Sequence, residues 1–174
     1  MQFHREKLKE LILHVSKKAR LRDLGSIKLN KVLWFSDITA YLHLGEPITG
    51  ETYLKRQFGP VSSHLPILLE ELKEARKIVV RDSILGGYDK KEYIALADPD
   101  LSQFSAEEIS IVDEFIDFVC NQNTAESISE LSHNRIWELA EIGEEIPYSA
   151  AFASNLGEIN EEDIRWAKEE MTRV

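Results

Sequence analysis

Cysteine is nearly absent from this chain of 174 residues, and long apolar runs are absent altogether. Cys120 is the only cysteine, so no internal disulfide can form, and we expect a reducing compartment. No apolar run approaches the roughly 20 residues that cross a bilayer. The first ten residues are polar and charged, unlike a secretory signal peptide. These absences predict a cytoplasmic protein with no membrane contact, organised as one domain over residues 1–174.

Signatures of metal, cofactor and phosphate binding are also lacking. The five histidines show no HExxH motif, no closely spaced histidine pair and no cysteine at ligand spacing. Gly86 and Gly87 form an isolated pair without a phosphate-loop or dinucleotide fingerprint. We therefore expect no metal and no cofactor.

A nucleophile could be imagined at Cys120, or at Ser62 with His64, but structural roles account for these residues better. Helical phase places Cys120 beside apolar residues, which is typical of an inert core thiol. Ser62 and Ser63 are at positions that suit helix caps. The sequence thus predicts a protein that is not an enzyme.

The net charge of −10 is unevenly distributed along the chain. Residues 1–60 hold eleven Lys or Arg against six Asp or Glu, whereas residues 61–174 hold ten against twenty-five. An acidic field of that kind repels nucleic acid and attracts a basic protein surface. Two alternatives stay open: the charge serves solubility, or the basic third neutralises the acidic part within the molecule.

Apolar periodicity and capping signals predict a mostly helical α+β domain with one short strand and one small β-hairpin. The segment 28–43 is apolar around most of its circumference, as a central helix would be. We expect Ser62 or Ser63 to cap a helix that runs to Glu74, and the spacing of Ser105 and Glu108 is that of a capping box that opens another. Further helices are expected at 5–20, 125–132, 134–140 and 160–174, a strand at about 52–56, and a hairpin pairing 78–80 with 93–96.

The order of helix, helix and hairpin is that of a winged-helix domain, which raises DNA binding as an alternative function. A reading helix needs basic side chains for phosphates, yet Lys73 is the only basic residue between Ser62 and Glu74. Nucleic acid is therefore not the expected partner. The alternative that stays open is a transcriptional regulator that contacts DNA through its basic N-terminal helices. Its basic stripe consists of Arg5, Lys7, Lys9, Lys17, Lys18, Arg20, Arg22, Lys28 and Lys31.

Two segments resemble the Panacea domain of SocA-like antitoxins. The first is KLNKVLWFSDITAYLHLGEPITGETYLKRQFGPV, over residues 28–61, and the second is LSHNRIWELAEIGEEIPYSAA, over residues 131–151. The matching motif positions are Lys28, Leu29, Lys31, Leu33, Phe35, Gly45, Pro47, Tyr53, Phe58, Gly59, Pro60, Val61, Ser132, His133, Trp137, Ile146, Pro147 and Tyr148. The sequence departs from the family pattern at Trp34, at Asp37 and over 54–56, which leaves the identity of the partner open.

The resemblance implies the antitoxin of a bacterial type II toxin–antitoxin system, of a phage-associated family, that neutralises a cognate toxin by direct contact. It also implies that partners vary, and that at least one type of member delivers its toxin to a Clp-type protease. A homo-oligomer stays open.

Most motif residues are expected to have a structural role. The apolar motif residues of 28–43 are assigned to the core, Gly59 and Pro60 to a turn, and His133 to a local hydrogen bond. Trp137 and Tyr148 are expected to pack inside, although aromatic residues also anchor interfaces. We assign partner binding to a strand near a sheet edge, which could accept a strand of the partner. The residues of this predicted contact are Tyr53, Lys55, Arg56, Gln57 and Phe58.

Overall fold

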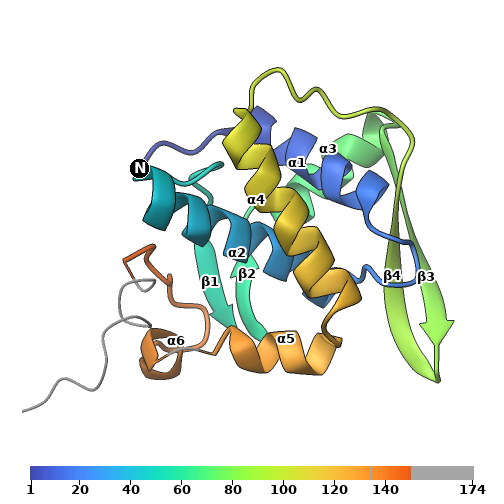
Figure 1. The fold of residues 1–174 in the computed structure, drawn as a ribbon. Coiled ribbons are helices and arrows are strands. Elements are labelled where there is room, and N and C mark those ends of the chain that lie inside the picture. Colours follow the sequence, from blue (N-terminus) through green and yellow to red (C-terminus); the bar gives the residue numbers. More distant parts are fainter. Residues whose placement is uncertain (134, 150–174) are drawn as a thin grey trace, which may run out of the picture.

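The structure is a computed structural model, and it describes residues 1–133 and 135–149. The helix expected at 160–174 lies outside the described residues. The elements in chain order are α1 (Arg5–Lys18), α2 (Ser26–Leu44), β1 (Tyr53–Arg56), β2 (Gly59–Ser62), α3 (Leu65–Glu74), β3 (Ile78–Leu85), β4 (Tyr88–Ala95), α4 (Ala106–Ile116), the π-helical turn η1 (Asp117–Asn121), α5 (Ala125–Leu131) and α6 (Arg135–Leu139). This is a mostly helical α+β fold, as the sequence predicts (Figure 1).

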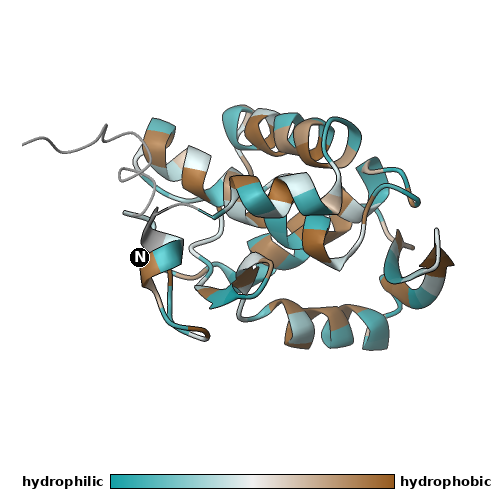
Figure 2. Ribbon diagram, turned by 90° about the horizontal axis from the view of Figure 1, so that it is seen from below, coloured by the Kyte–Doolittle hydropathy of each residue, from teal (hydrophilic) through white to brown (hydrophobic). Residues whose placement is uncertain are grey.

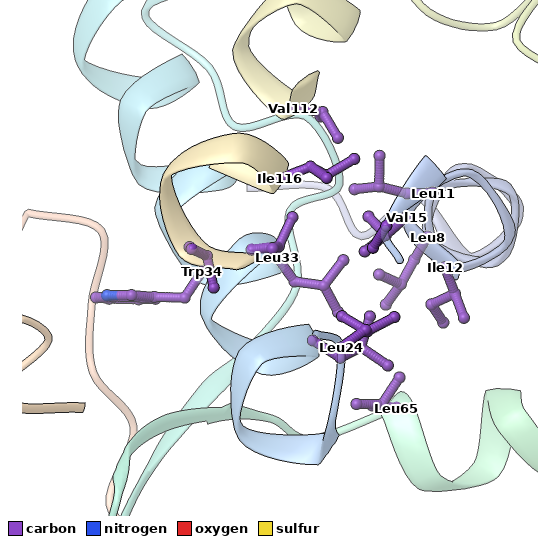
Figure 3. Packing of buried hydrophobic residues seen from close by; sticks show 14 of the residues in the cluster. Leu8, Leu11, Ile12, Val15, Leu24, Leu33, Trp34, Leu65, Val112 and Ile116 are labelled. Atoms are coloured by element: carbon purple, nitrogen blue, oxygen red, sulfur yellow. The ribbon is translucent and has the colours of Figure 1, made fainter. Parts of the chain in front are cut away.

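The core is built around α2, as its apolar circumference predicts. Helices α1, α4 and α5 and strands β2 and β4 all contact α2. Figure 3 shows side chains of α1, α2 and α4 gathered in one cluster, including Leu8, Leu11, Val15, Leu33, Val112 and Ile116. Most helices alternate apolar and polar stretches (Figure 2), which is the pattern of helices that bury one face. Unusually, α2 also buries polar side chains, among them Asn30, Lys31 and Asp37.

The expected helix ends follow from local chemistry. The Ser105 side chain accepts a hydrogen bond from the Glu108 N–H (3.1 Å), and the Glu108 carboxylate accepts one from the Ser105 N–H (2.8 Å). This is the predicted capping box at the start of α4. Ser62 Oγ accepts the Leu65 N–H at 3.0 Å. The cap position of α3 is nevertheless His64, whose side chain makes no cap bond, so the expectation of a cap at Ser62 or Ser63 is wrong. At the end of α2, Gly45 adopts the left-handed conformation that a side chain disfavours.

The region 52–62 differs from the prediction of one strand followed by a turn at Gly59 and Pro60. Gly59–Ser62 forms β2, antiparallel to β1, and the turn lies at Gln57 and Phe58. Pro60 is tolerated in this strand because it faces Lys55, whose own backbone N–H and C=O bond residues on the other side of β1. The missing N–H of Pro60 therefore costs no bond between the two strands.

The second hairpin is longer than the prediction. Strands β3 and β4 pair over eight residues each and leave only Gly86 and Gly87 as the turn. Both glycines have positive φ (60° and 86°), as the tight turns that suit the twist of a hairpin require. The polar residues 81–92, expected as a loop, therefore continue the ladder beyond the body of the protein (Figure 1).

Candidate protein-interaction site

Residues 143–146 run beside β1 on the edge opposite β2. The Lys55 N–H donates to Glu144 O (2.8 Å), the Gly143 N–H to Lys55 O (2.9 Å), and the Ile146 N–H to Tyr53 O (2.8 Å). Strand β1 thus lies between β2 and this segment. The expectation that β1 could accept a partner strand is wrong, because both of its edges already bond within the chain.

Two of the five residues assigned to partner contact prove to be buried. Tyr53 is 1% exposed and Lys55 is 9% exposed, so the expectation that their side chains face solvent is wrong. Lys55 Nζ donates to Glu138 O (3.2 Å) and Ala140 O (3.0 Å), carbonyls at the end of α6. It also lies 4.2 Å from the centre of the Trp137 ring, where the ring attracts a cation. Lys55 therefore fixes α6 against β1.

The Tyr53 side chain reaches a buried carboxylate on α2. Asp37 Oδ2 accepts hydrogen bonds from Tyr53 OH (2.8 Å) and Thr49 Oγ1 (2.5 Å), and Oδ1 accepts one from the Thr49 N–H (2.8 Å). Burial raises the pKa of Asp37 from 3.8 to about 6, although these hydrogen bonds oppose the rise. Tyr148 OH closes the cluster by donating to Glu51 O (2.7 Å).

The departures from the family pattern at Trp34 and Asp37 thus have structural roles. The Trp34 side chain is buried and meets the Tyr53 ring edge-on, with 4.9 Å between ring centres. Asp37 holds the polar cluster beneath β1. Neither side chain reaches the surface, so neither can select a partner by contact.

A second polar cluster joins the two segments that resemble the family. Lys31 is 1% exposed, and its Nζ donates to Pro60 O at 3.2 Å. Ser132 Oγ donates to Ser129 O (2.7 Å), and His133 stacks flat on Trp137, with 3.6 Å between ring centres. Burial lowers the pKa of Lys31 to about 7. Because these segments are far apart along the chain, their contact could not be predicted from the sequence.

Gly59 allows β2 to approach this cluster closely. Its φ is +98°, and a Cβ added there would collide with Ser132 Oγ and Lys31 Nζ. Replacing Gly59 with alanine is expected to destabilise the protein by on the order of 2 kcal/mol, because the backbone would be strained and both side chains displaced. Urea unfolding measures the change. A Gly86→Ala variant is the control: φ is also positive there, but an added Cβ meets no atom within 4 Å, so only the backbone cost applies. Equal losses in the two variants would contradict the steric argument.

The other three residues assigned to partner contact lie on the surface, at one side of a groove. Arg56, Gln57 and Phe58 are exposed, Phe58 to 53%. Together with the end of α6 and the turn after it, they line a concave space of about 830 Å³. The complete lining is Lys55, Arg56, Gln57, Phe58, Trp137, Ala140 and Ile142. We name this space the β1–α6 groove.

The lining residues of the β1–α6 groove that come from α6 and the turn after it were not predicted from the sequence. Ile142, which lines the groove, is 65% exposed, and Leu139, at the end of α6 and outside the lining, is 74% exposed. A sequence signal existed, because these apolar residues stand among glutamates without the spacing of a buried helix face. An exposed apolar cluster rimmed by polar residues marks an interaction site. The groove is therefore a candidate protein-binding surface.

The basic stripe of the N-terminal helices is largely neutralised within the molecule. Lys31 is buried, and Lys28 Nζ donates to Cys120 O at 3.0 Å. Five further members form ion pairs with acidic residues of other elements. These pairs are Arg5–Glu71, Lys7–Glu108, Lys9–Glu71, Lys17–Asp98 and Lys18–Asp113. Few of the nine charges remain to neutralise phosphates.

The side chains considered as nucleophiles have other partners. Cys120 is buried, and burial raises the pKa of its thiol to about 11, so the thiol stays protonated at neutral pH. Ser62 Oγ accepts the Leu65 N–H. Ser63 Oγ and Glu51 Oε1 both meet His64 at Nδ1 (3.0 and 2.9 Å), whereas a catalytic triad uses opposite ring nitrogens for the serine and the acid. Within residues 1–133 and 135–149, no group of three or more His, Cys, Asp or Glu could hold a metal ion.

The comparisons with known proteins decide the family. The sequence model of the family described as "Antitoxin SocA-like, Panacea domain" matches residues 29–138. The chain belongs to this family. The match extends from α2 through β1 and β2 to α6, so it contains the second polar cluster, the first one except Tyr148, and most of the β1–α6 groove. No curated protein and no solved structure matched the chain.

Membership of the SocA-like family gives the chain an antitoxin role and, in general, a toxin as its partner. An antitoxin family points to a regulatory role. In the part of this antitoxin that the structure describes, no helix combines the length and the apolar character that crossing a bilayer requires.

Proposed function

We propose that this protein neutralises a cognate toxin by direct protein–protein binding, with Arg56, Gln57 and Phe58 in the contact. The family match carries the proposal, and the β1–α6 groove supports it as an exposed apolar surface next to these residues. Binding requires no bond-making chemistry, which fits a protein whose polar clusters hold its fold together. We place the complex in the bacterial cytoplasm.

Co-expression with the product of the adjacent gene tests the proposal. That product alone is expected to stop bacterial growth, and this antitoxin is expected to restore it and to co-purify with it. If the antitoxin neither restores growth nor forms a complex with that product, the proposal is wrong. If co-expression of the antitoxin shortens the half-life of the toxin, and does so only when a Clp-type protease is present, this antitoxin is a protease adaptor. An unchanged half-life would indicate sequestration alone.

DNA binding through the N-terminal helices has less support, because most of the basic stripe is buried or paired. A mobility-shift experiment with the promoter DNA at low salt distinguishes the two functions, since phosphate contacts are strongest there. We expect no shift by the antitoxin alone. A salt-sensitive shift would favour the regulator.

A further inference from the structure

The β1–α6 groove is assembled from segments about 80 residues apart in the sequence. Phe58, at the turn between β1 and β2, and Ile142, after α6, both line it. Figure 1 shows α6 close to the end of β1, where the two segments meet. Buried Lys55 connects them through its bonds to the end of α6. The two segments that line the groove are therefore held together by Lys55, and the groove itself is open to solvent.

The rim of the groove, next to the lining residues Ala140 and Ile142, carries negative charge, although none of its carboxylates lines the groove itself. Residues 138–145 include four glutamates and no lysine or arginine, and all four glutamates are exposed. They are Glu138, Glu141, Glu144 and Glu145. Glu144 uses a carboxylate oxygen to accept the Glu141 N–H (2.7 Å), which keeps the turn and its charges in place. Arg56, which also lines the groove, is exposed, and its guanidinium lies beside Gly143 of this segment.

We propose that the groove takes an apolar side chain carried on a basic segment of the toxin. The apolar side chain would enter between Phe58 and Ile142, and lysine or arginine residues beside it would face the glutamate rim. An anchor in an apolar pocket surrounded by charge complementarity is the usual arrangement at a specific interface. The inference rests on the proposed function, and it adds the surface and the chemistry of the partner.

The charge of the rim decides between occupants. A second copy of this chain, docked groove to groove, would bring two glutamate rims together, and like charges at an interface oppose association. The phosphates of a nucleic acid would be repelled in the same way. A basic protein segment is attracted instead. The glutamates speed its encounter with the groove, and the apolar contact holds it there.

Binding of the purified product of the adjacent gene to variants of the full chain tests the groove. Phe58→Ala and Ile142→Ala are each expected to weaken binding by about 30-fold or more, as for residues at the centre of an interface. Ile67→Ala is the matched control, because Ile67 on α3 is 54% exposed, like Phe58 at 53%. We expect its Kd to stay within about 2-fold of that of the unaltered protein.

Charge reversal tests the rim separately. Glu141→Lys with Glu145→Lys is expected to slow association by about 10-fold at low salt, with a smaller difference at high salt. The control is Glu107→Lys with Glu114→Lys, a pair of exposed glutamates on α4. Equal effects of the two pairs would mean that only net charge matters and would overturn the assignment of the rim.

A photo-crosslinker at position 58 identifies the occupant. We expect a crosslink to a toxin segment that is rich in lysine or arginine. A crosslink to a second copy, or to residues 150–174 of the same chain, would overturn the inference. If the unaltered protein binds the toxin but Phe58→Ala and Ile142→Ala leave the Kd unchanged, the inference falls and the proposed function stands. If the unaltered protein binds no toxin, both fall.

Discussion

The unaltered protein is expected to become more stable as the pH rises from 7 to 9, and the Lys31→Met variant is expected to lose this rise. Lys31 is 1% exposed, and burial lowers its pKa from 10.5 to about 7. Over that window the unfolded chain binds a proton at Lys31 and the folded chain does not. The free energy of unfolding therefore increases with pH by about 1.4 kcal/mol per unit, towards a total of about 5 kcal/mol near pH 10.5.

Methionine keeps the unbranched apolar stem of Lys31 and removes the amine. The hydrogen bond to Pro60 O is lost with it, at a cost of about 1 kcal/mol that does not depend on pH. Urea unfolding at pH 7, 8 and 9 gives the slope for each protein. Lys73→Met, on the exposed surface of α3, is the control and should retain the slope of the unaltered protein. The same slope in Lys31→Met and the unaltered protein would show that Lys31 is solvated in the folded state.

The amine of Lys31 also has a structural role next to the proposed binding surface. It bonds the carbonyl of Pro60, two residues after Phe58, and it lies where a Cβ on Gly59 would collide. Buried polar groups of this kind fix one arrangement of the chain, because any other would leave the amine without a partner. Lys31 thereby helps to hold Gly59 and Pro60, the residues that follow Phe58, in place.

The helices could be predicted from the sequence because their signals are local. The apolar circumference of α2, the glycine that ends it and the capping box of α4 each lie within a few residues of the element that they define. Strand β2 could not be predicted in this way. Gly59 and Pro60 are typical of turns, and they are accepted in a strand because segment 143–146 bonds the other edge of β1.

The candidate site likewise contains residues that could be predicted from the local sequence and residues that could not. Phe58 could be placed at the surface from the motif around it, and its exposure agrees. Tyr53 and Lys55, in the same motif, turned inward because their partners, Asp37 and the end of α6, come from remote parts of the chain. Ile142 was missed for the same reason, since only the fold brings it into one groove with Phe58.

The Asp37→Asn variant is expected to remove a second pH dependence, of opposite sign. Burial raises the pKa of Asp37 from 3.8 to about 6, so between these values the folded protein binds a proton that the unfolded chain has released. Stability therefore falls as pH rises from about 4 to about 6, by about 3 kcal/mol in total. Asparagine carries no charge, so this part of the pH dependence disappears.

The same unfolding experiment at pH 4, 5 and 6 measures the effect, with Asp89→Asn on the exposed end of β4 as the control. An unchanged slope in Asp37→Asn would show that hydrogen bonds from Thr49 and Tyr53 outweigh burial and keep the carboxylate ionised. The offset in stability at one pH does not decide the matter, because the asparagine amide also places a donor among hydroxyl groups.

Asp37 and Lys31 together predict an unusual dependence of stability on pH for the whole protein. Most proteins are most stable between about pH 5 and 8, but these two groups lower stability there, because each is buried in an environment that penalises its charged form. They lie six residues apart on α2, on different faces, beneath β2 and β1 respectively. Their pH windows do not overlap, so the double variant should lose both slopes and each single variant only one. Loss of both slopes in either single variant would mean that the two clusters titrate as one unit.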